Sequence, residues 1–109
     1  MRTLKFIVDK QIITQDPKCD FSGLVPGSEG YLKAEFAFSP DWRDTVKGVG
    51  FWTRLGKECP PQILEDGKTC IIPAEALKGK EFKLAVMGKK EGFKLVTNKV
   101  IVRQDGGKR

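Results

Sequence analysis

The side chains of this chain that could carry out chemistry are three cysteines and fourteen carboxylates, and histidine is absent. The missing histidine excludes Ser–His–Asp and Cys–His nucleophilic sites and removes the commonest zinc ligand. Cys19, Cys59 and Cys70 contain no CxxC pair, so their spacing does not predict a thiolate zinc site. We therefore expect no metal and no cofactor.

The carboxylates do not form a recognisable catalytic pair. Two carboxylates could hydrolyse a glycosidic bond, but the acidic residues here lie in or near predicted loops, where charged side chains normally face solvent. The sequence Gly48-Val49-Gly50 lacks the third glycine and the following helix of a dinucleotide fingerprint. We predict that the protein is not an enzyme and that it has no catalytic residues.

The number of cysteines is odd, which argues against a disulfide framework. Free thiols are the expectation. A bridge between Cys59 and Cys70, or from Cys19 to a partner, remains open.

The chain has a net charge of +6, with 20 Lys and Arg against 14 Asp and Glu. Such a charge is compatible with nucleic-acid binding. Most basic residues, however, stand singly between apolar residues, where a strand would turn them to solvent. The apolar runs are far shorter than the roughly 20 residues of a membrane helix, and the N-terminus lacks the apolar core of a signal peptide. We expect no association with a membrane. We also expect that the protein is synthesised in the cytoplasm.

Apolar and polar residues alternate with a period of two along most of the chain, which is typical of half-buried strands. The segments with this pattern are residues 4–8, 12–14, 31–38, 46–55, 69–72, 82–87, 93–96 and 99–102. Their spacing predicts an all-β protein, a single antiparallel β-sandwich of seven to nine short strands spanning residues 1–103. One short helical turn is expected near residues 73–78, and residues 104–109 should form a flexible polar tail.

Several turns and edges follow from proline and glycine. Pro60-Pro61 should confine residues 58–64 to a sheet edge, and Asp66-Gly67 should join them to residues 69–72 as a hairpin. Ser39-Pro40 should start a short turn that carries Trp42 into the core. A loop is expected over residues 88–92, and the first or last strand should be the better docking edge.

Contact regions are predicted in the long loop at residues 16–30, at Trp52 and at the two termini. Long loops in compact domains are often functional. Trp42 and Phe51 are expected in the core, whereas Trp52 has the opposite parity from Phe51 and should face a partner. The interface candidates are Phe21, Leu24, Val25, Tyr31 and Trp52.

Four stretches resemble small immunoglobulin-like modules in virion proteins of tailed bacteriophages and prophages. They are residues 31–42, 72–77, 82–88 and 97–100, and the likeness covers roughly residues 4–102. The resemblance implies an immunoglobulin-like fold and a structural role in a tail, baseplate or capsid. It also implies synthesis in a bacterial host, contact with other virion proteins and assembly in several copies. It carries over no functional residue, because the shared motifs encode strands, turns and core positions.

Two alternatives from other classes remain. One is a basic β-barrel that binds nucleic acid through lysines and exposed aromatic rings. The other is a carbohydrate-binding surface module that uses the aromatic residues as a platform.

Overall fold

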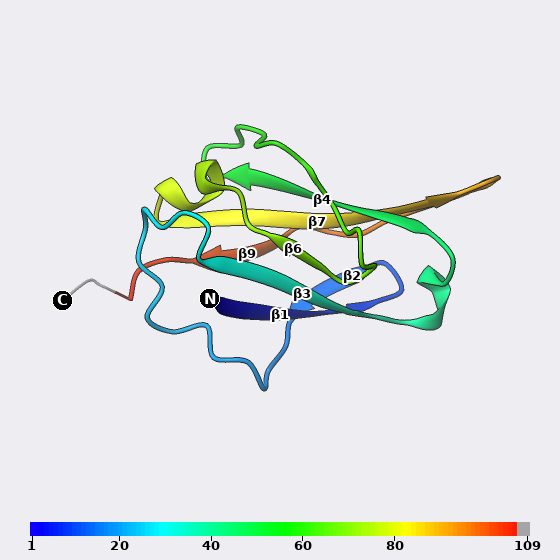
Figure 1. The fold of residues 1–109 in the computed structure, drawn as a ribbon, viewed down its shortest axis with the longest axis horizontal. Helices are drawn as coiled ribbons and strands as arrows, with labels where there is room; N and C mark the ends of the chain where they lie inside the picture. Colours follow the sequence, from blue (N-terminus) through cyan, green and yellow to red (C-terminus); the bar gives the residue numbers. More distant parts are fainter. Residues whose placement is uncertain (107–109) are drawn as a thin grey trace.

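The computed structural model describes residues 1–106, in which nine strands form two sheets (Figure 1). The first sheet has the order β2 (Ile12–Gln15), β1 (Arg2–Asp9), β3 (Leu32–Phe38) and β6 (Thr69–Ile71). The second has the order β5 (Gln62–Ile63), β4 (Val46–Thr53) and β7 (Glu81–Lys90), followed by β8 (Phe93–Val96) and β9 (Val100–Arg103), which both pair with β7. Within residues 1–106 we find no helix with the length and apolar character that a membrane span requires.

The predicted all-β sandwich is confirmed, with one departure from an antiparallel arrangement. β1 pairs with β3 in parallel, with Leu4 opposite Ala34 and Phe6 opposite Phe36, whereas the other strand pairs are antiparallel among the residues described. A parallel neighbour requires a crossover rather than a tight turn. Strand β2 and the long loop after it provide that crossover.

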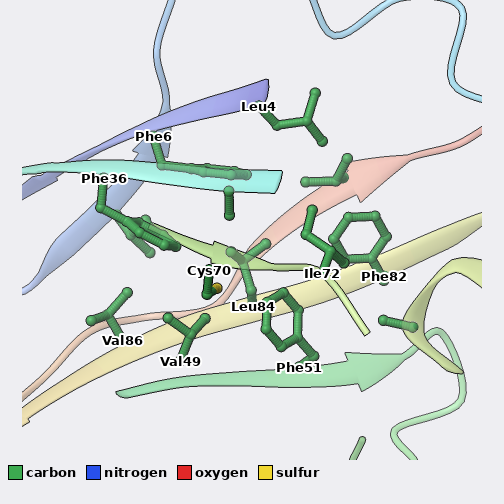
Figure 2. Packing of buried hydrophobic residues seen from close by; sticks show 14 of the residues in the cluster. Leu4, Phe6, Phe36, Val49, Phe51, Cys70, Ile72, Phe82, Leu84 and Val86 are labelled. Carbon is green, nitrogen blue, oxygen red and sulfur yellow. The ribbon is translucent and has the colours of Figure 1, made fainter. Parts of the chain in front are cut away.

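The core lies between the inward faces of the two sheets. Figure 2 shows Leu4, Phe6 and Phe36 of the first sheet pointing towards Phe51 and Leu84 of the second. The strict alternation of the sequence produces this arrangement, because successive side chains of a strand point to opposite faces. Phe51 and Trp42 are fully buried, as predicted.

Two 3₁₀ turns complete the fold, η1 (Pro40–Trp42) and η2 (Ala74–Lys78). Both were expected from proline and glycine positions. The Trp42 indole N–H donates to the Lys10 carbonyl at 2.8 Å. A Cβ on Gly88 would lie 2.7 Å from Cε3 of the Trp42 ring. The prediction of a loop from residue 88 is wrong, because Gly88 continues β7 beneath this ring and the turn follows only after Lys90.

The predicted hairpin at Asp66-Gly67 is also wrong. The turn forms, with Gly67 at a φ of 82°, but β5 pairs with β4 and β6 pairs with β3. The turn therefore carries the chain from one sheet to the other. A local turn signal cannot distinguish a hairpin from such a crossing, because the pairing partners are distant in sequence.

One side of the sandwich is closed by hydrogen bonds that join residues 11–15 to β9 and to the segment between β8 and β9. Asn98 Oδ1 accepts from the Ile13 backbone N–H at 2.8 Å, and the Asn98 N–H donates to the Gln11 carbonyl at 3.2 Å. The Gln15 side-chain amide donates to the Ile101 carbonyl at 3.0 Å. The first strand lies between β2 and β3, so its prediction as a docking edge is wrong.

Residues 104–106 pack against the domain, so their prediction as part of a flexible tail is wrong. Gln104 is buried, and its side-chain amide donates to the carbonyls of Leu77 and Gly79 at 3.0 and 2.9 Å. The N–H of Gly106 donates to the Leu24 carbonyl at 3.0 Å. These bonds hold the end of β9 against η2 and the long loop. The rest of the predicted tail, residues 107–109, lies outside the described residues.

Candidate functional site

The outward face of the second sheet is apolar at its centre. In β4, Val49 and Phe51 point into the core, so Gly48, Gly50 and Trp52 point outwards. The register places Met87 opposite Gly48 and Ala85 opposite Gly50. An antiparallel sheet usually carries polar side chains on its solvated face. This face instead carries glycine, alanine, methionine and tryptophan at its centre.

These residues form a concave site that we call the outer groove. Its floor consists of Gly48, Gly50 and Ala85, its walls of Ile63, Met87 and Val96, and Trp52 stands at one end. The cavity has a volume of about 460 Å³. The small floor residues create the hollow, since larger side chains at these positions would fill it.

The end of the groove is formed by Trp52 and two neighbours. A Cβ on Gly50 would lie 2.7 Å from Cη2 of the Trp52 ring, so the indole rests against the bare backbone of Gly50. The Lys99 ammonium lies 4.2 Å from the centre of the same ring. A cation at this distance is attracted by the ring's quadrupole. The glycine and the lysine together hold the indole along the sheet.

The walls of the groove are accessible to solvent. Ile63 is 59% exposed, Met87 45% and Val96 44%. A contiguous exposed apolar patch with an aromatic residue is a feature of protein contact sites. Methionine adds adaptability, because its unbranched side chain can conform to different partners.

The predicted contact residues do not gather at this groove. Trp52 lies there, on the face that its parity predicted. Val25 and Tyr31 are exposed, but they belong to the long loop and its end and do not line the groove. The loop passes β1 and then crosses the end of the sandwich to η2 (Figure 1), where the Gly27 N–H donates to the Leu77 carbonyl at 2.8 Å. Phe21 is half-buried and meets the Phe6 ring edge-on at 5.5 Å.

Leu24 is a corrected prediction. Its side chain is 3% exposed and belongs to the core cluster, so it cannot contact a partner directly. Leu24 anchors the loop to the domain by burying its apolar side chain. Phe21 contributes to the same anchoring.

Sequence reasoning missed most of the groove. Gly48 and Gly50 were considered as part of a dinucleotide fingerprint, which they do not match. Ala85 and Met87 share the outward parity of β7, and that signal was present in the sequence. Their position beside the two glycines depends on the register between β4 and β7, which no local pattern specifies.

A second cavity of about 570 Å³ lies at one end of the sandwich, beside η2. It is lined by Arg54, Lys57, Lys78 and Lys80 together with Glu75, and Cys59 lies at its wall. Burial, together with the nearby Glu75 carboxylate, raises the pKa of the Cys59 thiol. A thiol with a raised pKa stays protonated at neutral pH and is a poor nucleophile.

All three cysteines are free thiols. Burial raises the pKa of Cys70 to about 12. Cys19 is half-buried, and its sulfur accepts from the Lys5 N–H at 3.3 Å. In the part of the chain that the structure describes, no three His, Cys, Asp or Glu side chains cluster as metal ligands would.

Comparison with known proteins finds no matching family model, no similar curated protein and no similar solved structure.

Proposed function

We propose that this protein is a non-enzymatic structural protein of a bacteriophage virion and that it acts by protein–protein contact through the outer groove. The observation that carries the contact role is the exposed apolar groove on the outward face of the second sheet. Burial of its wall residues by a partner would remove them from water and favour association.

The groove suits a protein partner because it is already formed. Gly50 and Lys99 hold the Trp52 indole in place. The floor lies on β4 and β7, which are paired over eight residues in the middle of the second sheet. A rigid site loses less conformational entropy on binding than a flexible loop would. Tryptophan at such a site is often among the residues that contribute most to affinity.

The virion assignment is supported by the resemblance of residues 31–42, 72–77, 82–88 and 97–100 to immunoglobulin-like virion modules. These segments supply β3 with η1, η2, β7 and the link into β9. In this proposal the protein is made in the bacterial cytoplasm and incorporated in several copies among other tail, baseplate or capsid proteins. Repeated copies are the usual arrangement in symmetric assemblies.

The test compares two alanines on opposite outer faces. Ala85 lies on the groove floor, whereas Ala37 lies on the outward face of β3 in the first sheet. We expect Ala85→Arg to fold normally but to be missing from purified particles. Ala37→Arg should be incorporated like the unchanged protein. Gold labelling and electron microscopy of the particles would locate the protein.

A second variant separates contact from folding. Trp52→Ala should keep the melting temperature within a few degrees and reduce incorporation. A large loss of melting temperature would assign Trp52 to the core instead. Particles that contain none of the unchanged protein would contradict the virion role.

A further inference from the structure

We infer that the partner segment bound in the outer groove is acidic as well as apolar. This inference rests on the proposed contact function of the groove and specifies the chemistry of the partner. The apolar floor and walls show only that the partner is apolar. The distribution of charge around the groove indicates that it is also acidic.

Four lysines share the outward face with the groove on the side of β7, β8 and β9, and one of them, Lys99, lines the groove itself. In β7, the buried residues Phe82, Leu84 and Val86 alternate with outward residues. The outward lysines are Lys83 and Lys89 on β7, Lys94 on β8 and Lys99 just before β9. The partner therefore meets a cationic border next to the apolar hollow.

The acidic residues on this face do not neutralise the border. Glu81 lies directly opposite Arg103, and this pair is neutral as a unit. Glu58 lines the groove from the opposite side, at the β5 edge of β4, where its backbone forms an isolated β-bridge with Trp52. The face is therefore polarised, with cations towards β7 to β9 and a carboxylate towards β5.

Two of the lysines are placed unfavourably in the free protein. Lys89 and Lys94 face each other directly in the antiparallel register between β7 and β8. Like charges in directly opposed positions destabilise a sheet. The other register neighbour of Lys89 is Val46, which carries no charge. A partner carboxylate between the two ammonium groups would relieve their repulsion.

The shape of the groove adds the apolar requirement. The floor of Gly48, Gly50 and Ala85 offers no charged side chain to a ligand, and the walls are Ile63, Met87 and Val96. A segment that places aliphatic side chains on this floor and carboxylates towards Lys89, Lys94 and Lys99 would satisfy both features. Charge complementarity of this kind also increases the rate of association.

Two other occupants fit less well. A second copy docked by the same face would bring eight lysines close together, four from each copy. A nucleic acid would pair its phosphates with the lysines but would leave Met87 and Val96 against a charged backbone. Its bases would have Trp52 to stack on, and that ring is already contacted by Gly50 and Lys99.

The experiment is a selection from a random library of 12-residue peptides displayed on an unrelated carrier. We expect the selected peptides to be enriched in Asp and Glu together with Leu, Ile or Phe. Binding should change the fluorescence of Trp52, since the other tryptophan, Trp42, is fully buried. The affinity should fall at least tenfold between 50 and 500 mM salt, because opposite charges are screened.

Matched variants locate the binding. Ala85→Arg and, independently, Lys89→Glu should each weaken the selected peptides at least tenfold. Ala37→Arg and Lys33→Glu place the same changes on the outward face of the first sheet and should leave binding unchanged. Lys89 is exposed at the surface, so its variant tests the charge even if Ala85→Arg perturbs the fold.

The results that would overturn the inference are distinct from those that would overturn the contact function. Selected peptides that are neutral or basic yet lose binding in Ala85→Arg would refute the acidic partner and keep the groove as a contact site. Binding of a 15-nucleotide oligothymidylate that Ala85→Arg abolishes would also refute the acidic partner and keep the groove as a contact site. Dimerisation through the groove, measured by sedimentation, would have the same consequence. Two results together would refute both the acidic partner and the contact function of the groove. They are selected peptides that bind Ala85→Arg as tightly as the unchanged protein, and normal incorporation of Ala85→Arg into particles.

Discussion

The benzo ring of Trp52 lies directly against Gly50 on the outward face of β4, where an added Cβ would stand 2.7 Å from Cη2. The two residues are separated by one position, so both point to the same side of the sheet. Glycine at this position allows a large ring to lie along the strand instead of standing up from it. The shape of the groove depends on this relationship.

The first prediction compares two glycines of the same strand. Gly50→Ala should force the Trp52 ring away from the sheet, shift its emission and destabilise the fold by about 1 kcal/mol, because added volume in a packed contact is unfavourable. Gly48→Ala should be neutral or stabilising by up to about 1 kcal/mol, since glycine is unfavourable inside a strand. Its Cβ would meet the Gln62 carbonyl at 3.6 Å and Ile63 at 3.7 Å, which are ordinary contacts. Urea unfolding and tryptophan emission would measure both, and equal effects would contradict the assigned packing.

The second prediction concerns the closed side of the sandwich. Asn98→Ala should lower the free energy of unfolding by about 1–2 kcal/mol, because the Ile13 N–H loses its side-chain acceptor. Amide hydrogen exchange at Ile13 should become faster. Thr14→Ala, at an exposed position of the same strand, is the control. Unchanged exchange at Ile13 would show that Asn98 does not join the two sheets.

The third prediction concerns the buried Gln104. Gln104→Leu should cost about 1–3 kcal/mol of stability, because the carbonyls of Leu77 and Gly79 lose their donor. Gln104→Glu should cost more, since a carboxylate would face two carbonyl oxygens. Gln62→Leu is the control, because that amide makes one exposed bond to the Pro60 carbonyl. Thermal unfolding would compare the three, and a fully stable Gln104→Glu would contradict this geometry.

The fourth prediction concerns stability in acid. Asp66 accepts from the Thr69 hydroxyl and from the N–H groups of Lys68 and Thr69, and these bonds lower its pKa to about 2 from 3.8. The folded-state pKa lies below the unfolded value, so the stabilisation is complete above about pH 4 and is lost as the pH falls towards 2. Asp66→Asn should therefore lie closest to the unchanged protein near pH 2 and differ most above pH 4. Urea unfolding between pH 2 and pH 5 would measure the free energy of unfolding of both proteins, with Glu65→Gln as the control. A difference between Asp66→Asn and the unchanged protein that stays constant with pH would contradict the prediction.

The fifth prediction concerns the thiols. One cysteine, Cys19, should react with a thiol reagent in the native protein at pH 8, because Cys59 and Cys70 are buried and their pKa values are raised. All three should react after unfolding in guanidinium. Cys19→Ser should abolish the native reaction. Rapid native labelling of Cys70 would show that the edge near β6 opens more readily than its packing indicates.

The elements of this fold could be read from local patterns, but several connections could not. The alternation over residues 4–8 and 82–86 identified strands and their buried faces, because a side chain's direction in a strand depends only on its position. The outcome at Asp66-Gly67 depended on which strands lie beside β5 and β6. Gly88 looked like the start of a loop, but it pairs with Lys47 of β4 and Leu95 of β8, so the strand continues. The Trp42 ring above it explains why this residue is glycine.

By itself, the sequence determined the all-β class, the inward position of Phe51 and the outward position of Trp52, since these depend on parity within single segments. It also determined the inward position of Trp42, which follows from the turn that Ser39-Pro40 begins. The tertiary structure decided that Leu24 is buried, that Gln104 belongs to the domain and that Ala85 and Met87 lie beside Gly50 and Gly48. These outcomes depend on strand register and on loop packing between distant segments. They arise from contacts between residues far apart in the chain, and no local period encodes those contacts.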